Sequence, residues 1–227
     1  MVAVTNSLAM GTFHEKSDID LFIVAEAGHL YTVRLLLKIM TQLFGVRVHH
    51  DYIAGRFCMS FVVTMRAMNL GPIALPFDPH LAEFACTMMP LFDAETYREW
   101  CTANESWLSH YGRLMPRMDR LKDSRFLSVL RSGAEALLDF LGTVIERISK
   151  KILLPRDLAY QKRFPEADCI LTDDIFKFHE NDPRRRIAEE WPVSTARPPR
   201  RLSLSPSQKI QTFDEFHSQE NVGMKSE

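Results

Sequence analysis

Apolar residues follow two different periods in the first third of the chain. Residues 2–5 and 18–24 are short apolar runs rich in β-branched and aromatic side chains, which is typical of strands. Between residues 29 and 44 the apolar positions recur at steps of three and four, which predicts a helix that ends at Gly45. Two further strands are predicted over residues 46–53 and 56–64, and we expect them to pair antiparallel.

From residue 78 onward the pattern changes to that of helices. Asp78 followed by Pro79 is a typical N-cap and first helical turn. Apolar stripes continue the pattern, so helices are predicted over residues 78–89, 94–111 and 119–154. Residues 171–182 fit either a short strand or a helical turn, and the pattern does not decide between the two.

The composition changes again after Pro183. The stretch that follows is rich in proline, arginine and serine and has little apolar periodicity, which predicts a mostly disordered tail with solvated arginines at 184–186. The predicted organisation is therefore an α/β core over residues 1–77, a helical region over 78–182 and a tail over 183–227. The predicted fold class is α+β, with a mixed β-sheet flanked by helices and followed by a helical C-terminal region.

Charge and cysteine content narrow the function classes. The chain has 227 residues, with 28 basic and 29 acidic side chains, so its net charge of -1 gives no general attraction to nucleic acid or to a membrane. Nucleic acid is therefore not a favoured partner. The four cysteines share no metal-ligand spacing, and no run of apolar residues is long enough for a membrane helix. We expect a cytoplasmic protein with reduced thiols.

Two acidic residues interrupt the second apolar run, "DIDLFIV". On a strand, Asp18 and Asp20 point to one face, whereas Ile19 and Leu21 point to the other face, into the core. Two neighbouring carboxylates repel each other, and a divalent cation removes that repulsion. Oxygen ligands suit Mg²⁺, which binds through one or two carboxylates together with water and substrate phosphates.

The segment before the pair, "TNSLAMG", offers groups that suit a phosphate. Ser7 has a hydroxyl, and Gly11 gives the backbone freedom to turn. If a helix begins near Leu8, its first N–H groups would also face the phosphates of a nucleotide.

The string as a whole resembles a known family. It combines a strand, Ser7, Gly11 and, eleven residues after Ser7, the first aspartate of a pair on the next strand. This order resembles the nucleotidyltransferase superfamily, which has the DNA-polymerase-β-like fold. Later stretches such as "DPHLAEF" and "KFHEND" resemble uncharacterised bacterial members with a helical C-terminal extension.

The resemblance implies a fold, an activity and a set of site residues. It implies a nucleotidyltransferase-like mixed sheet and transfer of a nucleoside monophosphate from an NTP, with ATP favoured, to an acceptor hydroxyl with release of pyrophosphate. The acceptor could be a small molecule, a protein side chain or an RNA end. Asp18 and Asp20 would be the catalytic ligands of Mg²⁺ or Mn²⁺, with Asp51 as the candidate third carboxylate. The nucleotide would be bound by Asn6, Ser7, Gly11 and Lys16.

The sequence departs from the family pattern at three places. Asn6 stands where the family has glycine, and Ser60 stands where the third carboxylate is expected. The chain also begins almost on the first strand, whereas family members commonly have a helix before it. These departures support an alternative, a protein of the same fold that binds or regulates without catalysing.

Overall fold

The computed structural model describes residues 1–48, 52–111, 125–179 and 182–190, with the backbone alone over 125–141. Asp51 and the predicted tail beyond residue 190 lie outside these ranges. Among the residues described, none of the helices is both long enough and apolar enough to cross a membrane.

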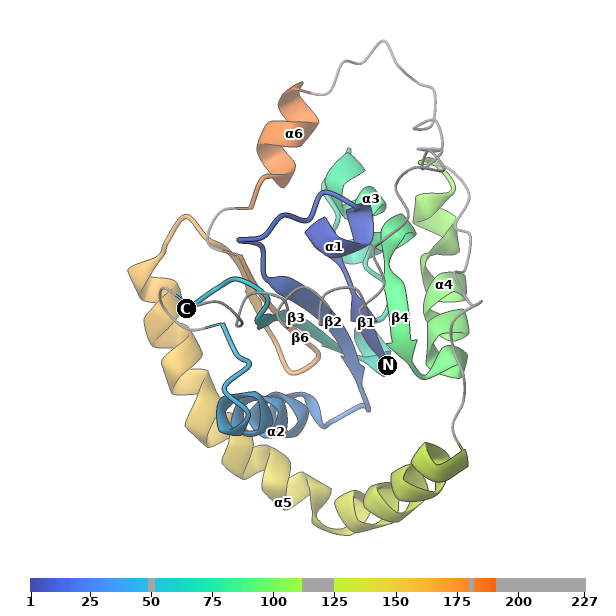
Figure 1. Ribbon diagram of the computed structural model, residues 1–227, viewed down its shortest axis with the longest axis vertical. Helices are drawn as coiled ribbons and strands as arrows, with labels where there is room; N and C mark the ends of the chain where they lie inside the picture. The colour runs from blue at the N-terminus through green and yellow to red at the C-terminus, as the bar shows by residue number, and fades with distance from the viewer. Residues whose placement is uncertain (49–51, 112–124, 180–181, 191–227) are drawn as a thin grey trace, which may run out of the picture. The chain divides into compact units, whose positions relative to one another are not determined.

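A six-stranded mixed sheet forms the centre of the molecule (Figure 1). Its strand order is β4-β1-β2-β3-β6-β5, and β2 and β3 are parallel whereas the other neighbours are antiparallel. The mixed sheet and flanking helices confirm the predicted α+β class. The strands are β1 (Val2–Val4), β2 (Ile19–Ala25), β3 (Phe57–Thr64), β4 (Met89–Phe92), β5 (Asp168–Leu171) and β6 (Ile175–His179).

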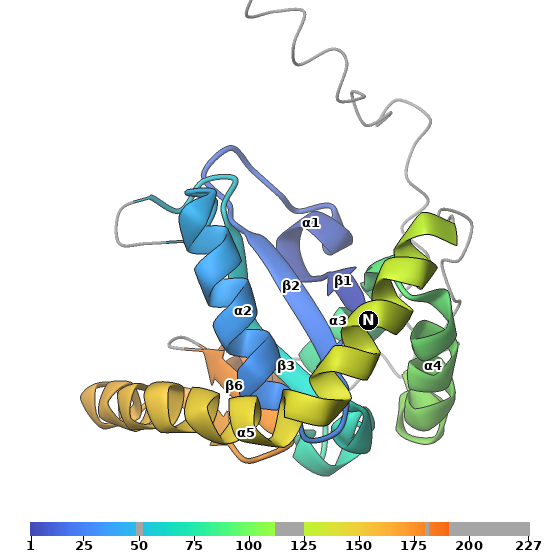
Figure 2. The same ribbon diagram turned by 90° about the horizontal axis from the view of Figure 1, so that it is seen from below.

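Helices cover both faces of this sheet (Figure 1 and Figure 2). Phe22 of β2 packs into one core with residues of α3 and α4, including the fully buried Trp100. Its neighbour Ile23 packs into a second core with Leu30 of α2 and Leu153 of α5. The alternation predicted for β2 is therefore confirmed. The helices are α1 (Asn6–Met10), α2 (Leu30–Leu43), α3 (Pro79–Thr87), α4 (Ala94–Leu108), α5 (Arg125–Arg163) and α6 (Arg184–Glu190), with short 3₁₀ turns at Met65–Ala67 and Gly71–Ile73.

The local predictions around α2 and α3 had mixed outcomes. Asp78 caps α3 as predicted, because its side chain accepts a hydrogen bond from the N–H of Leu81.

The antiparallel pairing predicted for residues 46–53 is wrong. In the part of that segment that the structure describes, Arg47 forms an isolated bridge to Phe57, and that bridge is parallel. The alternation of apolar and polar residues indicated an extended chain, but it carries no information on whether the partner strand runs parallel or antiparallel.

The region predicted as helical also contributes three strands to the sheet. Helix α3 ends at Thr87, and β4 begins at Met89, the last residue of the predicted helix. β5 and β6 form a hairpin that joins the sheet next to β3. Pro90 lies in β4, at the edge of the sheet, where a missing N–H is tolerated. The apolar run "TMMPLF" has no period that separates a helix end from an edge strand.

The start of the predicted tail is also corrected. Residues 184–190 form α6, and Arg184 is buried rather than solvated. Its guanidinium binds Asp78 at the cap of α3, and also Asp168 and Asp182. The buried ammonium group of Lys177 shares Asp168 and Asp182. The sequence shows the arginine but not the carboxylates that the fold brings to it.

Candidate functional site

The start of α1 lies directly beside the aspartate pair. Strand β1 runs antiparallel to β2, with Val4 opposite Leu21, and the N–H of Thr5 donates to the carbonyl of Asp20 at 3.0 Å. Helix α1 begins at the next residue, Asn6, whose φ is 51°. Asparagine adopts this left-handed region more readily than most residues other than glycine, as expected from the sequence.

Asp18 and Asp20 bring their carboxylates together, as the spacing predicted. Asp20 is the second residue of β2, whereas Asp18 immediately precedes the strand. One oxygen from each carboxylate and the sulfur of Cys58 all lie within 4.8 Å of one another. The two aspartates are only half-buried, so the group is reachable from solvent.

The surroundings of Asp20 offset its negative charge only in part. Burial raises the pKa of its carboxyl group, and the neighbouring charge of Asp18 raises it further. Hydrogen bonds from the side chains of Asn6 and Cys58 act in the opposite direction but do not cancel the rise. A nearby cation would relieve the remaining cost of the two negative charges.

A bulge in β3 brings Cys58 opposite Asp20. Between the pairs Asp20–Cys58 and Phe22–Phe61, β2 advances by two residues and β3 by three. The extra residue changes the alternation along β3, as bulges do. Ser60 was the expected position of the third carboxylate, but Cys58 is the residue across from Asp20. The position of Cys58 could not be predicted from the sequence, because a bulge leaves no mark in the apolar pattern.

Cys58 is not equivalent to a carboxylate. Burial, followed by the charge of Asp20, raises the pKa of its thiol to about 12. The thiol therefore stays protonated at neutral pH and donates to Asp20 instead of adding negative charge. Asp51, the other candidate for a third carboxylate, lies outside the described residues.

The polar contacts continue from Cys58 toward β6. Ser60 hydrogen-bonds Cys58, and its hydroxyl lies 3.4 Å from Nε2 of His179. Burial lowers the pKa of His179 to about 4, and the positive charge of Lys177 contributes to the shift. At neutral pH the imidazole is therefore uncharged. Its Nδ1 is buried without a hydrogen-bond partner among the described residues.

The expected phosphate-binding residues lie on α1 and the following loop. Gly11 ends α1 with φ 76°, and its N–H donates to the carbonyl of Ser7. Within the described part of the chain, nothing hydrogen-bonds to the Ser7 hydroxyl, which leaves it available. Lys16 is exposed in the loop before β2, and its backbone N–H donates to Nδ1 of His14.

Comparisons of the chain with protein-family models, with curated proteins and with solved structures found no match. Asp18 and Asp20 are the residues that could hold a hard divalent cation, because the amide of Asn6 and the thiol of Cys58 offset only part of the charge of Asp20.

Proposed function

We propose that the chain is a divalent-metal-dependent nucleotidyltransferase that moves a nucleoside monophosphate from an NTP, ATP in the favoured case, to an acceptor hydroxyl with release of pyrophosphate. The observation that carries the proposal is the convergence of Asp18 and Asp20 next to the start of α1. The mixed sheet with β2 at its centre agrees with the nucleotidyltransferase-like fold that the motif resembles.

In this proposal the protein's own residues have distinct roles. Asp18 and Asp20 would hold Mg²⁺ or Mn²⁺, which when bound would neutralise negative charge on the phosphates of the NTP. Asn6 donates to Asp20 and so orients one carboxylate. The hydroxyl of Ser7 is free to contact the triphosphate, and the left-handed turn at Gly11 closes the loop behind it.

A second candidate function is a catalytically inactive protein of the same fold that binds nucleotide or regulates. The protonated thiol of Cys58 favours it, because a thiol stands across from Asp20 in place of a carboxylate. Neither Cys58 nor the neutral His179 can supply the negative charge of a third metal ligand. Binding of Mg²⁺ and ATP without transfer would support this alternative.

The deciding experiment follows both binding and transfer. Thermal unfolding of the full chain is measured with ATP in the presence and absence of Mg²⁺, for the wild type and for Asp18→Asn and Asp20→Asn. We expect stabilisation that requires Mg²⁺ and is lost in both variants. Incubation of the same proteins with α-labelled NTPs and cell lysate then detects transfer of the monophosphate to an acceptor.

Each outcome separates the hypotheses. Stabilisation with transfer supports the enzyme, whereas stabilisation without transfer supports the binding protein. Glu15→Gln is a matched control, because Glu15 is an exposed carboxylate in the loop that leads to Asp18. If the wild type and the aspartate variants respond alike to Mg²⁺ and ATP, the metal site is wrong.

A further inference from the structure

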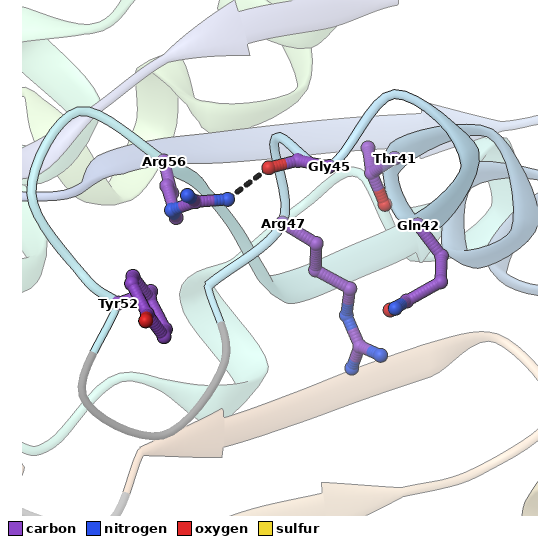
Figure 3. Close-up of a pocket in the computed structure, with 6 residues that line it drawn as sticks. All are labelled: Thr41, Gln42, Gly45, Arg47, Tyr52 and Arg56. Carbon is purple, nitrogen blue, oxygen red and sulfur yellow. Dashed lines mark hydrogen bonds between the residues drawn. The ribbon is translucent and has the colours of Figure 1, made fainter.

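We propose that the protein has a second binding site, a pocket for a phosphate group between the C-terminal end of α2 and the segment before β3 (Figure 3). The pocket has a volume of about 150 Å³. This is smaller than the roughly 300 Å³ at which drug-sized ligand sites begin, and it suits a group of a few heavy atoms. Its lining residues are Thr41, Gln42, Gly45, Arg47, Tyr52 and Arg56.

The charges of the lining favour an anion. Arg47 and Arg56 are both half-buried, and none of the described lining residues is acidic. The amine of Lys38, one turn earlier on α2, lies near this arginine: burial lowers its pKa, and the positive charge of the neighbouring Arg47 lowers it further. Asp157 lies close enough to affect Lys38, but its carboxylate is already held by both terminal nitrogens of Arg34. Among the described residues, the positive charge of Arg47 and Arg56 is therefore not balanced by a carboxylate at the pocket.

The N–H groups of the two arginines are largely unused. Arg56 gives one terminal nitrogen to the carbonyl of Gly45, and its guanidinium lies 5.3 Å from the ring centroid of Tyr52. Arg47 has no hydrogen bond or ion pair from its guanidinium to any described residue. In Figure 3 this guanidinium extends away from the Arg56–Gly45 bond, on the side of Gln42. A planar guanidinium with free N–H groups can donate two parallel hydrogen bonds to two oxygens of one phosphate.

A purely structural role explains only one of the two arginines. A cation at the end of a helix satisfies the last carbonyl groups and interacts well with the helix dipole. Arg56 does this through Gly45 at the end of α2. Arg47 makes no such bond among the described residues, so capping does not account for its position on the same pocket wall.

The position of the pocket assigns the phosphate to the acceptor, and this step rests on the function proposed above. The carbonyl of Arg56 accepts a hydrogen bond at 2.8 Å from the N–H of Ile19, the residue between Asp18 and Asp20. The N–H of Gly55 also donates to the carbonyl of Ser17 at 2.9 Å. The segment that bears Arg56 is thus bonded to the segment that bears the aspartate pair. The nucleotide residues proposed above, Asn6 and Ser7, follow directly after β1, and β1 pairs with β2 on the edge opposite to β3. An acceptor that carries a phosphate in addition to its reacting hydroxyl would therefore bind with that phosphate in the pocket at Arg47.

Titration of the metal-free full-length protein with inorganic phosphate at low ionic strength tests the pocket. We expect saturable binding that Arg47→Gln weakens roughly tenfold or more, because a charge-assisted pair of hydrogen bonds is lost. Arg47→Lys keeps the positive charge but loses the pair of parallel N–H donors. Its affinity for phosphate should therefore lie between those of the wild type and Arg47→Gln. Arg98→Gln removes an exposed arginine from α4 and should bind like the wild type. Equal affinity in the wild type and Arg47→Gln, or no binding by the wild type, overturns the site.

Titration with ATP and Mg²⁺ tests the assignment to the acceptor. We expect Arg47→Gln to bind ATP with Mg²⁺ as the wild type does, whereas Asp20→Asn loses that binding but still binds inorganic phosphate. If Arg47→Gln weakens binding of ATP, the pocket serves the triphosphate and the acceptor assignment is wrong. If phosphate binds through Arg47 while ATP with Mg²⁺ does not bind at all, the pocket stands and the proposed nucleotidyltransferase function fails.

Discussion

Glu146 of α5 holds Thr32 of α2 by two hydrogen bonds, one from the backbone N–H at 2.7 Å and one from the side-chain hydroxyl at 2.8 Å. The N–H of Tyr31 donates to the other carboxylate oxygen at 2.9 Å. His29, the N-cap residue of α2, makes no capping bond with its own side chain. A carboxylate from a distant helix therefore caps α2, and it also lies favourably at the positive end of the helix dipole.

Replacing Glu146 by alanine should destabilise the fold. The change leaves the N–H groups of Tyr31 and Thr32 without their acceptor, so we expect the free energy of unfolding to fall by about 1–2 kcal/mol. Urea unfolding followed by circular dichroism measures this difference. Thr143→Ala, an exposed substitution on the same helix, should change stability by less than about 0.5 kcal/mol. Equal stabilities of the two variants would show that Glu146 is not the cap.

Replacing Arg184 by alanine should lower the free energy of unfolding more than the same change at Arg185. Arg184 is buried and binds three carboxylates, those of Asp78, Asp168 and Asp182. Removing one member of a buried ionic group leaves unpaired charge, and the expected loss is about 3–5 kcal/mol. Arg185 is exposed, so Arg185→Ala is the control and should be nearly neutral. A loss below about 1 kcal/mol for Arg184→Ala, in a chemical denaturation series, would contradict the proposed role of α6 in the fold.

The imidazole of His179 should make stability depend on pH. Its pKa of about 4 in the folded protein lies below the ordinary value of 6.5, because burial disfavours the charged ring. The contribution of the neutral ring is therefore fully present above pH 6.5 and is lost as the pH falls toward 4. The shift corresponds to about 3 kcal/mol at most. His179→Asn should flatten the profile of unfolding free energy between pH 7 and pH 4, and parallel profiles for the two proteins would refute the effect.

The raised pKa of Asp20 predicts a variant that is more stable than the wild type without metal. The ionised carboxylate is disfavoured by burial and by Asp18, so its cost is absent below the ordinary pKa of 3.8 and grows as the pH rises through the raised value. Asp20→Asn removes the charge and keeps an acceptor for the Asn6 amide. We expect higher thermal stability of Asp20→Asn at pH 7 in EDTA, with the gain vanishing at acid pH.

Addition of Mg²⁺ should narrow or reverse the difference in thermal stability between Asp20→Asn and the wild type, because the cation stabilises only the protein with both carboxylates. The measurement is the unfolding temperature of both proteins over a series of Mg²⁺ concentrations. A wild type that is already the more stable protein in EDTA would show that the charge of Asp20 is compensated within the chain.

Local features could be predicted from the sequence where a short-range rule decides them. Asp78 with Pro79 marked the start of α3, and the alternation along β2 separated Asp20 and Phe22 from Leu21 and Ile23. The spacing of Asp18 and Asp20 also predicted their close approach. Each of these depends on residues only a few positions apart, so backbone periodicity is enough.

Other features were missed because they depend on which segments pair. β4 follows α3 in one apolar run, and the bulge that moves Cys58 opposite Asp20 arises only in the pairing of β2 with β3. The carboxylate partners of Arg184 come from positions up to 106 residues away along the chain. An arginine among prolines and serines looks solvated until the carboxylates around it are known.

The sequence by itself determined the mixed α/β character of the first 64 residues and the two carboxylates at the start of β2, since both follow from side-chain period. Only the tertiary structure decided what surrounds those carboxylates. It brings Asn6 and Cys58 to Asp20 and Glu146 to α2, and it gathers Arg47 and Arg56 at one pocket. The physical reason is that hydrogen bonds, burial and charge interactions act through space, whereas a sequence pattern reports only neighbours along the chain.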